Sequence, residues 1–431
     1  MQFLSPRDGQ RLSATIRGIP LVDGLPIEEI AGQDWRPCRG DLALPALTLD
    51  EAAFAVNRDL FLRWCKGAGV TVAPHAKTPM SPELARSLRE AGAWGTTVAT
   101  IQQAAVLLAH GERRLLLANE IGGLAAGRRL GALLSAYPDV ELHAFADSPA
   151  AVVALAEAAR VAGRSKLSVL IELGSGRAGA RDRAAVEATM AAVLAADRLV
   201  LGGVATYEGA AATPDAGETA RAIAALMERT IEAFALVRTA APGLPLIISA
   251  GGSAYFDIVA HALAPVAQAD GNATVLLRSG ALFFADHGVY ARAFAELDRR
   301  GGLLIDGTLH AAAKSFRPAL TLWAEVLSRP QADLAIAGFG MRDASFDQGL
   351  PVPLRVFRDG VEQQGLAESL SVTRLNDQHA FVSVAAESAL AVGDVIAFGI
   401  SHPCTCLDRW RVIFGLDEAG VVARALPTQF G

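Results

Sequence analysis

The segment VELHAFADSPAAVVALAEAARVAGRSKLSVLIEL, residues 140–173, decides the fold of this chain. The apolar run at 140–146 has the length of a buried strand, and the alanine-rich stretch at 149–162 has the length of a helix. A second strand-like run follows at 167–173. Strands that alternate with helical stretches in this way indicate parallel strands joined by crossover helices.

The same alternation extends in both directions, from Val70 to Phe284. We expect strands at 70–75, 95–99, 114–118, 140–146, 167–173, 199–206, 246–249 and 273–277. We expect helices at 81–91, 149–162, 183–196, 215–239 and 255–263. Two more helices should follow the strands at 95–99 and 114–118 and end at residues 109 and 136.

Eight such strands are the number that closes a barrel. The alternative, an open doubly wound sheet, would usually begin with a glycine-rich phosphate turn after its first strand. Here the first strand ends in Pro74-His75-Ala76-Lys77-Thr78, which contains no glycine. We therefore predict an α/β fold built on a (β/α)8, TIM-like barrel with a second, mostly β C-terminal domain.

The helix–strand alternation fades after about Tyr290, where strand-like runs and turn signals such as Gly338-Phe339-Gly340 take over. We place the barrel at 46–289 and the mostly β domain at 290–431. Residues 1–45 show no clear periodicity, and we expect them to pack on the second domain.

The composition excludes several classes of protein. Although 52% of the 431 residues are hydrophobic, the apolar runs end well short of the roughly 20 residues that cross a bilayer. The N-terminus lacks the pattern of a signal peptide, and four cysteines are too few for a disulfide framework. The net charge of −6 and the absence of basic blocks argue against nucleic acid as a partner. We expect a cytoplasmic protein that binds neither membrane nor nucleic acid.

Polar and glycine residues gather where the strands end, which is where barrels place their active sites. Lys77 follows the first strand, and only four of the 39 basic residues are lysines. A lysine at the barrel mouth can have a lowered pKa, which favours Schiff-base chemistry. A strand-end lysine in a salt bridge is the alternative.

The loop at 249–253, Ser-Ala-Gly-Gly-Ser, is typical of a phosphate-binding loop, because glycines let backbone N–H groups approach an anion and a helix follows. Ser279-Gly280 after the eighth strand would supply the other part, since barrels often bind phosphate after strands seven and eight. Arg177 could face a cofactor ring or a substrate carboxylate, or lie on the surface. Tyr207 could contact the phosphate, or belong to the core.

The segment Ser401-His402-Pro403-Cys404-Thr405-Cys406-Leu407-Asp408 carries a second cluster. On a strand, its histidine, cysteines and aspartate would share one face. Imidazole and thiolate suit zinc, and two protein ligands would leave positions for water and substrate. A buried histidine with inert cysteines is the alternative. His379 is a weaker candidate for a nearby polar role.

Taken together, these motifs resemble the D-serine dehydratase and D-threonine aldolase family, fold type III pyridoxal phosphate enzymes similar in the barrel to alanine racemase. The resemblance begins at Pro74 to Thr78, the Schiff-base lysine motif, and ends at His402 to Thr405. Between them it includes Gly174 to Arg177, Tyr207-Glu208-Gly209, Ser249 to Gly252, Arg278-Ser279-Gly280, Phe316 to Leu320 and Asp347 to Pro351.

The resemblance implies a homodimer, pyridoxal 5'-phosphate and a divalent metal, for which zinc is our choice. It makes Lys77 the catalytic Schiff-base residue and His402 and Cys404 the metal ligands. It assigns cofactor contacts to His75, Arg177, Tyr207, Ser249, Gly251, Gly252 and Ser279. The chain departs from the family pattern at Pro79-Met80 and at Ala210, where a basic residue or a histidine is often found.

The implied reaction is the dehydration and deamination of a D-hydroxy amino acid such as D-serine, which gives a keto acid and ammonia. A cysteine as metal ligand favours this dehydratase. The alternative with the same site is an aldolase that releases glycine and an aldehyde from D-threonine or another D-3-hydroxy amino acid. Racemisation needs a second base on the opposite face of the substrate. A non-catalytic pyridoxal phosphate-binding protein would need neither the metal site nor the second domain.

Overall fold

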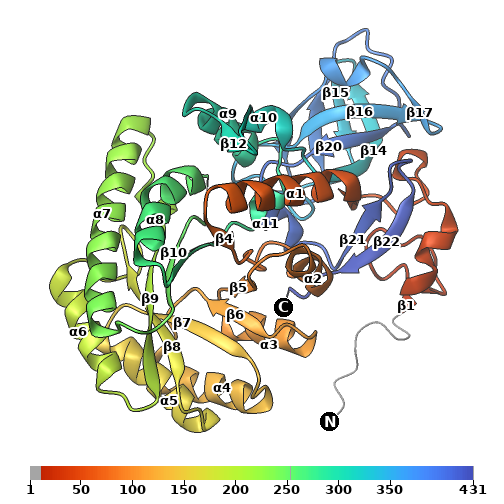
Figure 1. Cartoon of the computed structure of the whole chain (residues 1–431). Coiled ribbons are helices and arrows are strands. Elements are labelled where there is room, and N and C mark those ends of the chain that lie inside the picture. The colour runs from red at the N-terminus through yellow and green to blue at the C-terminus, as the bar shows by residue number, and fades with distance from the viewer. Residues whose placement is uncertain (1–10, 253, 431) are drawn as a thin grey trace.

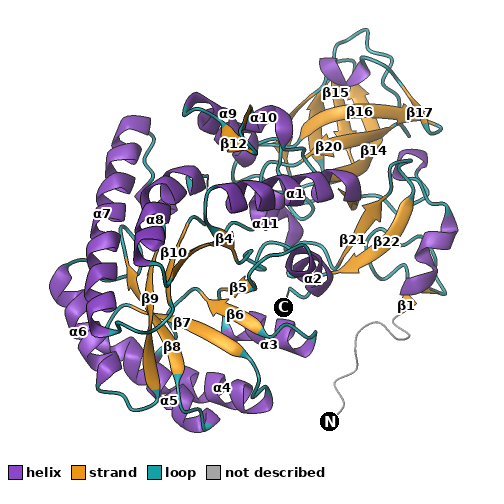
Figure 2. Ribbon diagram, in the orientation of Figure 1, coloured by secondary structure: helices purple, strands orange, loops and turns teal. Residues whose placement is uncertain are grey.

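The computed structural model describes residues 11–252 and 254–430. Residues 1–10 of the expected N-terminal segment and Ser253 of the expected phosphate loop lie outside the described residues. Figure 1 shows the chain as two parts: a barrel of strands wrapped by helices, and a β-sheet domain on the other side of helix α1 (Glu51–Gly67). Figure 2 shows that strands dominate the second part, whereas helices cover the outside of the first.

The first part is an eight-stranded parallel sheet in the order β4-β11-β10-β9-β8-β7-β6-β5. Its strands are β4 (Thr71–Val72), β5 (Thr96–Val98), β6 (Arg114–Leu117), β7 (Glu141–Ala146), β8 (Leu167–Leu173), β9 (Leu199–Thr206), β10 (Leu246–Ala250) and β11 (Ala273–Leu277). Its helices are α2 (Pro82–Glu90), α3 (Ile101–Ala109), α4 (Gly123–Ala136), α5 (Pro149–Ala162), α6 (Arg183–Leu194), α7 (Ala216–Ala240) and α8 (Phe256–Asp270).

The sheet closes on itself just beyond β4. The backbone N–H of Ala76 donates to the carbonyl of Thr97 at 2.9 Å, and the N–H of Thr97 donates to Pro74 at 3.0 Å. These bonds join the segment that leads to Lys77 to strand β5, so the predicted barrel is confirmed. Its interior is a packed layer to which nearly every strand contributes: Ala73, Leu116, Phe145, Leu170, Ala205, Ile247 and Leu276.

The second part is a ten-stranded sheet whose main path runs β17-β16-β20-β14-β15-β19-β18. Its strands are β14 (Leu320–Gln331), β15 (Leu334–Ala337), β16 (Val352–Arg358), β17 (Val361–Glu362), β18 (Ser371–Leu375), β19 (Ala380–Ser383), β20 (Val395–Gly399), β21 (Val412–Leu416), β22 (Val422–Pro427) and β3 (Ala46–Asp50). Strand β3 pairs with β14 and β21, so the residues just before α1 belong to this sheet.

Three sequence-based expectations differ from the structure. Helix α8 runs through Pro265 to Asp270 rather than ending at 263, because buried residues on both sides of this exposed proline, Leu263 and Ala267, hold the helix against the barrel. Residues after 290, expected to be strand-like, begin with helix α9 (Val289–Arg299). The antiparallel pair β12 (Leu303–Ile305) and β13 (Thr308–His310) follows, and then the short helix α10 (Ala312–Ser315). The segment at 402–408, expected to be a strand, contains helix α11 (Pro403–Leu407).

The N-terminal residues that the structure describes cover one face of the second sheet. They include short strands β1 (Arg11–Leu12) and β2 (Leu25–Pro26) and the 3-10 helices η1 (Ile27–Gln33) and η2 (Pro37–Arg39). Leu12, Ile19 and Trp35 share an apolar cluster with Trp323 and Phe414 of the sheet. In the described part of the chain, no helix combines the length and apolar character needed to cross a membrane.

Candidate active site

A cavity of about 90 Å³ opens at the carboxyl ends of the barrel strands. Its walls come from the loops that follow most of the strands, as expected for a barrel active site. The residues that line it are His75, Lys77, Ala99, Ala118, Asn119, Arg177, Tyr207, Gly252 and Arg278. Five of the residues that we predicted for the site are therefore brought together, namely His75, Lys77, Arg177, Tyr207 and Gly252.

Lys77 extends from the loop after β4 into this cavity. Part of its side chain is exposed to solvent, yet the surrounding protein desolvates the ammonium enough to lower the pKa of Lys77. The thiol of Cys404 acts in the opposite direction, and the nearby charges of Arg177 and Arg278 lower this pKa further. A lysine with a lowered pKa is the kind that can act as a nucleophile or as a base.

Arg278, at the end of β11, is a cation held below the cavity, and its side chain is almost fully buried. Its Nη1 donates to Ser249 Oγ at 2.8 Å and its Nη2 donates to the carbonyl of Thr206 at 2.7 Å. The guanidinium also lies 5.5 Å from the ring of Phe145. Burial lowers the pKa of Arg278, and the carboxylates of Glu208 and Glu172 oppose this. These contacts fix a positive charge at the floor of the site.

Arg177 and Tyr207 lie against each other on the cavity wall, with the guanidinium 4.8 Å from the ring centroid. Such a stack is a cation–π contact, which restricts an otherwise exposed arginine. Burial raises the pKa of Tyr207, and so does the charge of Glu208. The arginine therefore presents its charge to the cavity rather than projecting freely into solvent.

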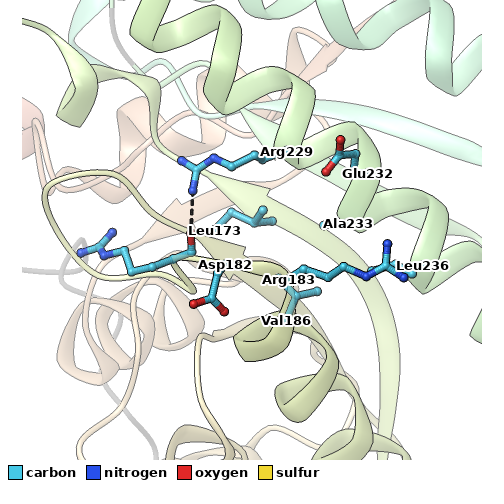
Figure 3. A pocket seen from close by; sticks show the side chains of 9 residues that line it. Leu173, Asp182, Arg183, Val186, Arg229, Glu232, Ala233 and Leu236 are labelled. Atoms are coloured by element: carbon cyan, nitrogen blue, oxygen red, sulfur yellow. Dashed lines mark hydrogen bonds between the residues drawn. The ribbon is translucent and has the colours of Figure 1, made fainter.

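Hydrogen bonds from other parts of the barrel hold the loop that carries Arg177, near its start at Gly174 and near its end at Gly179 and Arg181. Its Gly179 N–H donates to Asp147 at 3.1 Å. Figure 3 shows Arg229 of α7 reaching this loop, where it donates to the carbonyls of Arg181 at 2.9 Å and Gly174 at 3.3 Å. The separate cavity drawn there, about 80 Å³, lies between this loop and α7, and none of the predicted site residues lines it.

The polar groups of the predicted phosphate loop form hydrogen bonds with other protein groups, which we did not expect. The hydroxyl of Ser249 donates to Leu276 at 3.0 Å, and the hydroxyl of Ser279 donates to Gly251 at 2.8 Å. The N–H of Gly251 donates to the buried carboxylate of Glu208 at 2.9 Å. These groups shape the loop between β10 and α8, and their contact with a phosphate stays a prediction.

Two glycines nevertheless bring backbone close to the cavity. A Cβ on Gly280 would lie 2.5 Å from the carbonyl oxygen of His75, and a Cβ on Gly252 would lie 3.2 Å from the Tyr207 ring. Only glycine fits the first of these positions without displacing the backbone next to Lys77. His75 itself is held neutral, because burial and the charge of Lys77 depress its pKa, and its buried Nδ1 has no protein partner.

A pair of carboxyl groups lies at the same end of the barrel, in Glu120 after β6 and Glu172 of β8. Burial, the hydrogen bond to Glu172 and the charges of Glu172 and Asp147 raise the pKa of Glu120 to about 9. Two carboxyl groups in contact cannot both ionise, so this pair shares one proton. We had not singled out Glu120 or the side chain of Glu172 from the sequence.

His402 and Cys404 meet the barrel site from the second domain. His402 is the residue before α11, and Cys404 lies in its first turn. Cys404 Sγ is 3.2 Å from the hydroxyl of Thr78, the residue next to Lys77. The two candidate metal donors therefore lie beside the lysine.

Asp347 orients this pair. Its carboxylate accepts from His402 Nδ1 at 2.7 Å and from the hydroxyl of Thr405 at 2.6 Å. A partner on Nδ1 leaves Nε2 of the imidazole for a metal. Contact with Cys404, and then with Asp347, raises the pKa of His402 to about 9, although burial opposes this. A metal would have to replace that proton.

The other members of the predicted cluster point elsewhere, because the segment is helical. Cys406 is fully buried and lies 3.9 Å from the carbonyl of Asp343, and Asp408 is exposed beside Arg409. His379 is exposed between β18 and β19. Across residues 11–252 and 254–430, no group of three or more histidine, cysteine, aspartate or glutamate side chains is arranged to hold a metal.

The barrel residues 49–264 match the family model of the alanine racemase N-terminal domain. The chain belongs to this family. Residues 319–416 match a second family model, described as a putative serine dehydratase domain. The two matches together cover most of the barrel, without β11, and most of the second sheet.

Three similar proteins have names that state an activity. D-threonine aldolase of an Arthrobacter species is 26% identical over 79% of this chain and 80% of its own length. D-threo-3-hydroxyaspartate dehydratase of a Delftia species is 29% identical over 56% of this chain and 62% of its own length. The structure of D-threonine aldolase from Filomicrobium marinum has a TM-score of 0.71 and 24% identity, covering 90% of this chain and 95% of that one.

A further structure of a D-threo-3-hydroxyaspartate dehydratase, a cysteine-to-alanine mutant, is described as the metal-free form. It has a TM-score of 0.67 and 24% identity and covers 90% of this chain and 98% of that one. Similarity at this level shows that this member of the alanine racemase N-terminal domain family shares the fold with those proteins.

Proposed function

We propose that this chain is a pyridoxal phosphate- and metal-dependent lyase that acts on D-configured β-hydroxy amino acids. More specifically, we propose a D-serine type dehydratase, which gives a keto acid and ammonia. The observation that carries the proposal is the 3.2 Å contact between Thr78 and Cys404, since it joins the lysine loop of the barrel to the His-x-Cys segment of the second domain.

The residues present fit pyridoxal phosphate. The cavity is cationic on two sides, from Arg177 on its wall and Arg278 on its floor, which suits an anionic cofactor. The buried Nδ1 of His75 has no hydrogen-bond partner within the described residues, and the lack of a Cβ at Gly280 lets the His75 backbone lie close to the end of β11. When bound, pyridoxal phosphate would supply an electron sink for the charge that develops at the substrate Cα.

The donors His402 and Cys404 also fit a divalent metal. Imidazole and thiolate are ligands that zinc prefers, and two protein donors would leave coordination positions for water or substrate. A metal at this place would polarise the β-hydroxyl of a substrate, which is a poor leaving group without such help. One similar structure, a cysteine-to-alanine mutant of a D-threo-3-hydroxyaspartate dehydratase, is described as the metal-free form, which is consistent with a cysteine donor here.

The chain's own residues would then divide the work. Lys77 would hold the cofactor through Nζ and, once released from it, would accept the proton from the substrate Cα, which its lowered pKa favours. Arg177, held against Tyr207, would bind the substrate carboxylate or the cofactor ring. Arg278, fastened by Ser249 and Thr206, would keep a fixed charge below the cavity. Asp347 would hold the imidazole of His402 in one orientation.

The alternative candidate is an aldolase with the same site residues, which would release glycine and an aldehyde. Its support is the similarity to the Arthrobacter D-threonine aldolase, which extends over 79% of this chain. We place the dehydratase first because Cys404 offers a soft thiolate donor, which suits zinc.

Product analysis separates these reactions. The purified protein with pyridoxal phosphate would be given D-serine, L-serine, D-threonine and D-threo-3-hydroxyaspartate, with and without a chelator. We expect keto acid and ammonia from D-substrates only, and loss of both products with the chelator. Glycine and an aldehyde would move the assignment to the aldolase. Turnover of L-serine at an equal rate would refute the D preference.

Two further parts of the proposal concern assembly and location. We propose a homodimer, as the family resemblance implies, and light scattering after size-exclusion chromatography would test it: a mass near that of one chain at micromolar concentration would contradict it. We also propose a cytoplasmic location, which fractionation of the source cells would test.

A further inference from the structure

The described N-terminal segment, residues 11–45, lies outside both family matches, which begin at 49 and end at 416. Its apolar residues pack on the second sheet. One of its polar residues, Arg17, makes hydrogen bonds outside this apolar cluster. Arg17 extends to the loop after β15 and to the residues just after α11. It thus connects the N-terminal segment with the region that carries His402 and Cys404.

The Arg17 guanidinium contacts two segments, residues 342–343 and residues 409–410. It forms an ion pair with Asp343, and its Nη1 donates to the carbonyl of Arg342 at 3.1 Å. Its Nη2 donates to the carbonyl of Arg409 at 2.8 Å, and the guanidinium lies 4.7 Å from the ring of Trp410. One planar group therefore ties residues 342–343 to residues 409–410.

The loop that begins at Asp343 continues directly to the residues that hold the metal donors. The hydroxyl of Ser345 accepts from the backbone N–H of His402 at 3.1 Å. Asp347 then accepts from the His402 imidazole and from Thr405 of α11. A displacement of this loop relative to α11 would change the orientation of the imidazole.

The buried carboxylate of Asp343 requires a positively charged partner, which Arg17 supplies. The side chain of Asp343 is 2% exposed, whereas that of Arg17 is 43% exposed. Without Arg17, solvent could therefore not stabilise the charge of the Asp343 carboxylate. The carboxylate also accepts from the N–H of Gly340 at 2.9 Å, and the backbone carbonyl of Asp343 accepts from Trp410 Nε1 at 2.9 Å. Removal of the arginine would leave a buried carboxylate without its countercharge, which favours displacement of the loop.

We propose that Arg17 is a positioning residue that braces the 342–349 loop against α11 and thereby sets the geometry with which His402 and Cys404 receive a divalent metal. The inference rests on the metal part of the proposed function. It gives the N-terminal segment, which the family matches do not include, a role at the active site.

The test measures metal affinity rather than activity. Wild type, Arg17→Ala and Arg17→Lys would be titrated with Zn²⁺ against a competing chelator and with Co²⁺, whose thiolate charge-transfer absorbance reports on Cys404. Arg36→Ala is the matched control, because Arg36 lies in the same segment but donates to Ala419, away from α11. Urea unfolding of each variant would report stability separately.

We expect Arg17→Ala to bind Zn²⁺ about tenfold more weakly, the lower end of the loss seen when outer partners of metal ligands are removed. Arg17→Lys should recover part of this affinity because it keeps the charge, and Arg36→Ala should bind as wild type does. If Arg17→Ala does not fold, Asp343→Asn removes the same ion pair while keeping an acceptor for Gly340, and the same loss is expected.

Wild-type Zn²⁺ affinity and an unchanged Co²⁺ spectrum in folded Arg17→Ala would overturn the brace while leaving the proposed metal site intact. Equal losses in Arg17→Ala and Arg36→Ala would also overturn it, since they would trace the effect to general destabilisation. A wild-type chain that binds neither ion would refute the metal part of the proposed function, and the brace with it.

Discussion

Replacement of Glu120 by glutamine should make the protein more stable at alkaline pH, because it removes a proton that the native state must hold. The pKa of Glu120 is raised from 4.5 to about 9, mainly by burial and by Glu172. Between these values the folded chain binds one proton more than the unfolded chain. Native stability that is present at low pH is therefore lost as the pH rises towards 9.

The loss of stability, measured as the free energy of unfolding, depends on how many pH units lie between the unfolded and the folded pKa of Glu120. Each pH unit inside it costs about 1.4 kcal/mol, so a rise from pH 5 to pH 8 costs about 4 kcal/mol for a fully buried group. Because Glu120 is partly exposed, we halve this to about 2 kcal/mol. Glutamine does not titrate, and its amide can still donate to Glu172.

Urea unfolding of wild type and Glu120→Gln at pH 5, 6, 7 and 8 would measure this difference, since other titrating groups contribute equally to both proteins. The two should be similar at pH 5, and the variant should gain about 2 kcal/mol by pH 8. Glu228→Gln removes an exposed carboxyl group of α7 and should show no such trend. A difference that does not change with pH would refute a proton shared between Glu120 and Glu172.

Three further outcomes follow from the site. Lys77→Ala should abolish both turnover and the visible absorbance of bound pyridoxal phosphate, and retention of that absorbance would exclude Lys77 as the attachment point. Asp347→Ala should weaken Zn²⁺ binding about ten- to hundredfold, whereas the exposed Asp408→Ala should not, as competition with a chelator would show. Gly280→Ala should lower cofactor affinity in equilibrium dialysis, because its Cβ would lie 2.5 Å from the carbonyl of His75; wild-type affinity would contradict that close approach.

The barrel was predictable because its strands are buried on both faces and read as short apolar runs. The expected strands at 167–173 and 199–206 and the expected helix at 149–162 have the same bounds in the structure. Helix α8 was predicted too short: it continues past Pro265, an exposed residue, because Leu263 and Ala267 on either side of it are buried against the barrel.

The segment after His402 was misjudged for a reason that was visible in the sequence. Period-two spacing of His402, Cys404 and Cys406 suggested a strand, but Pro403 directly after His402 is typical of the first position of a helix. The error left the two predicted ligands, His402 and Cys404, unchanged but added Cys406 and Asp408 as candidates. Only on a strand would Cys406 share a face with the other two, whereas the helix buries it in the core.

Side chains that carry chemistry could be found from local motifs, but the residues that orient them could not. Lys77, His402 and Cys404 each lie in a recognisable short pattern, whereas Asp347, Arg278 and Arg17 gain their importance from partners far away in the chain. The charges around Lys77 illustrate the consequence. Burial lowers the pKa of Lys77 most. Cys404 of the second domain raises this pKa, and Arg177 and Arg278 of the barrel lower it further, so the reactivity of Lys77 also depends on the contact between the two domains. A contact such as that of Arg17 can therefore act on the site without touching substrate.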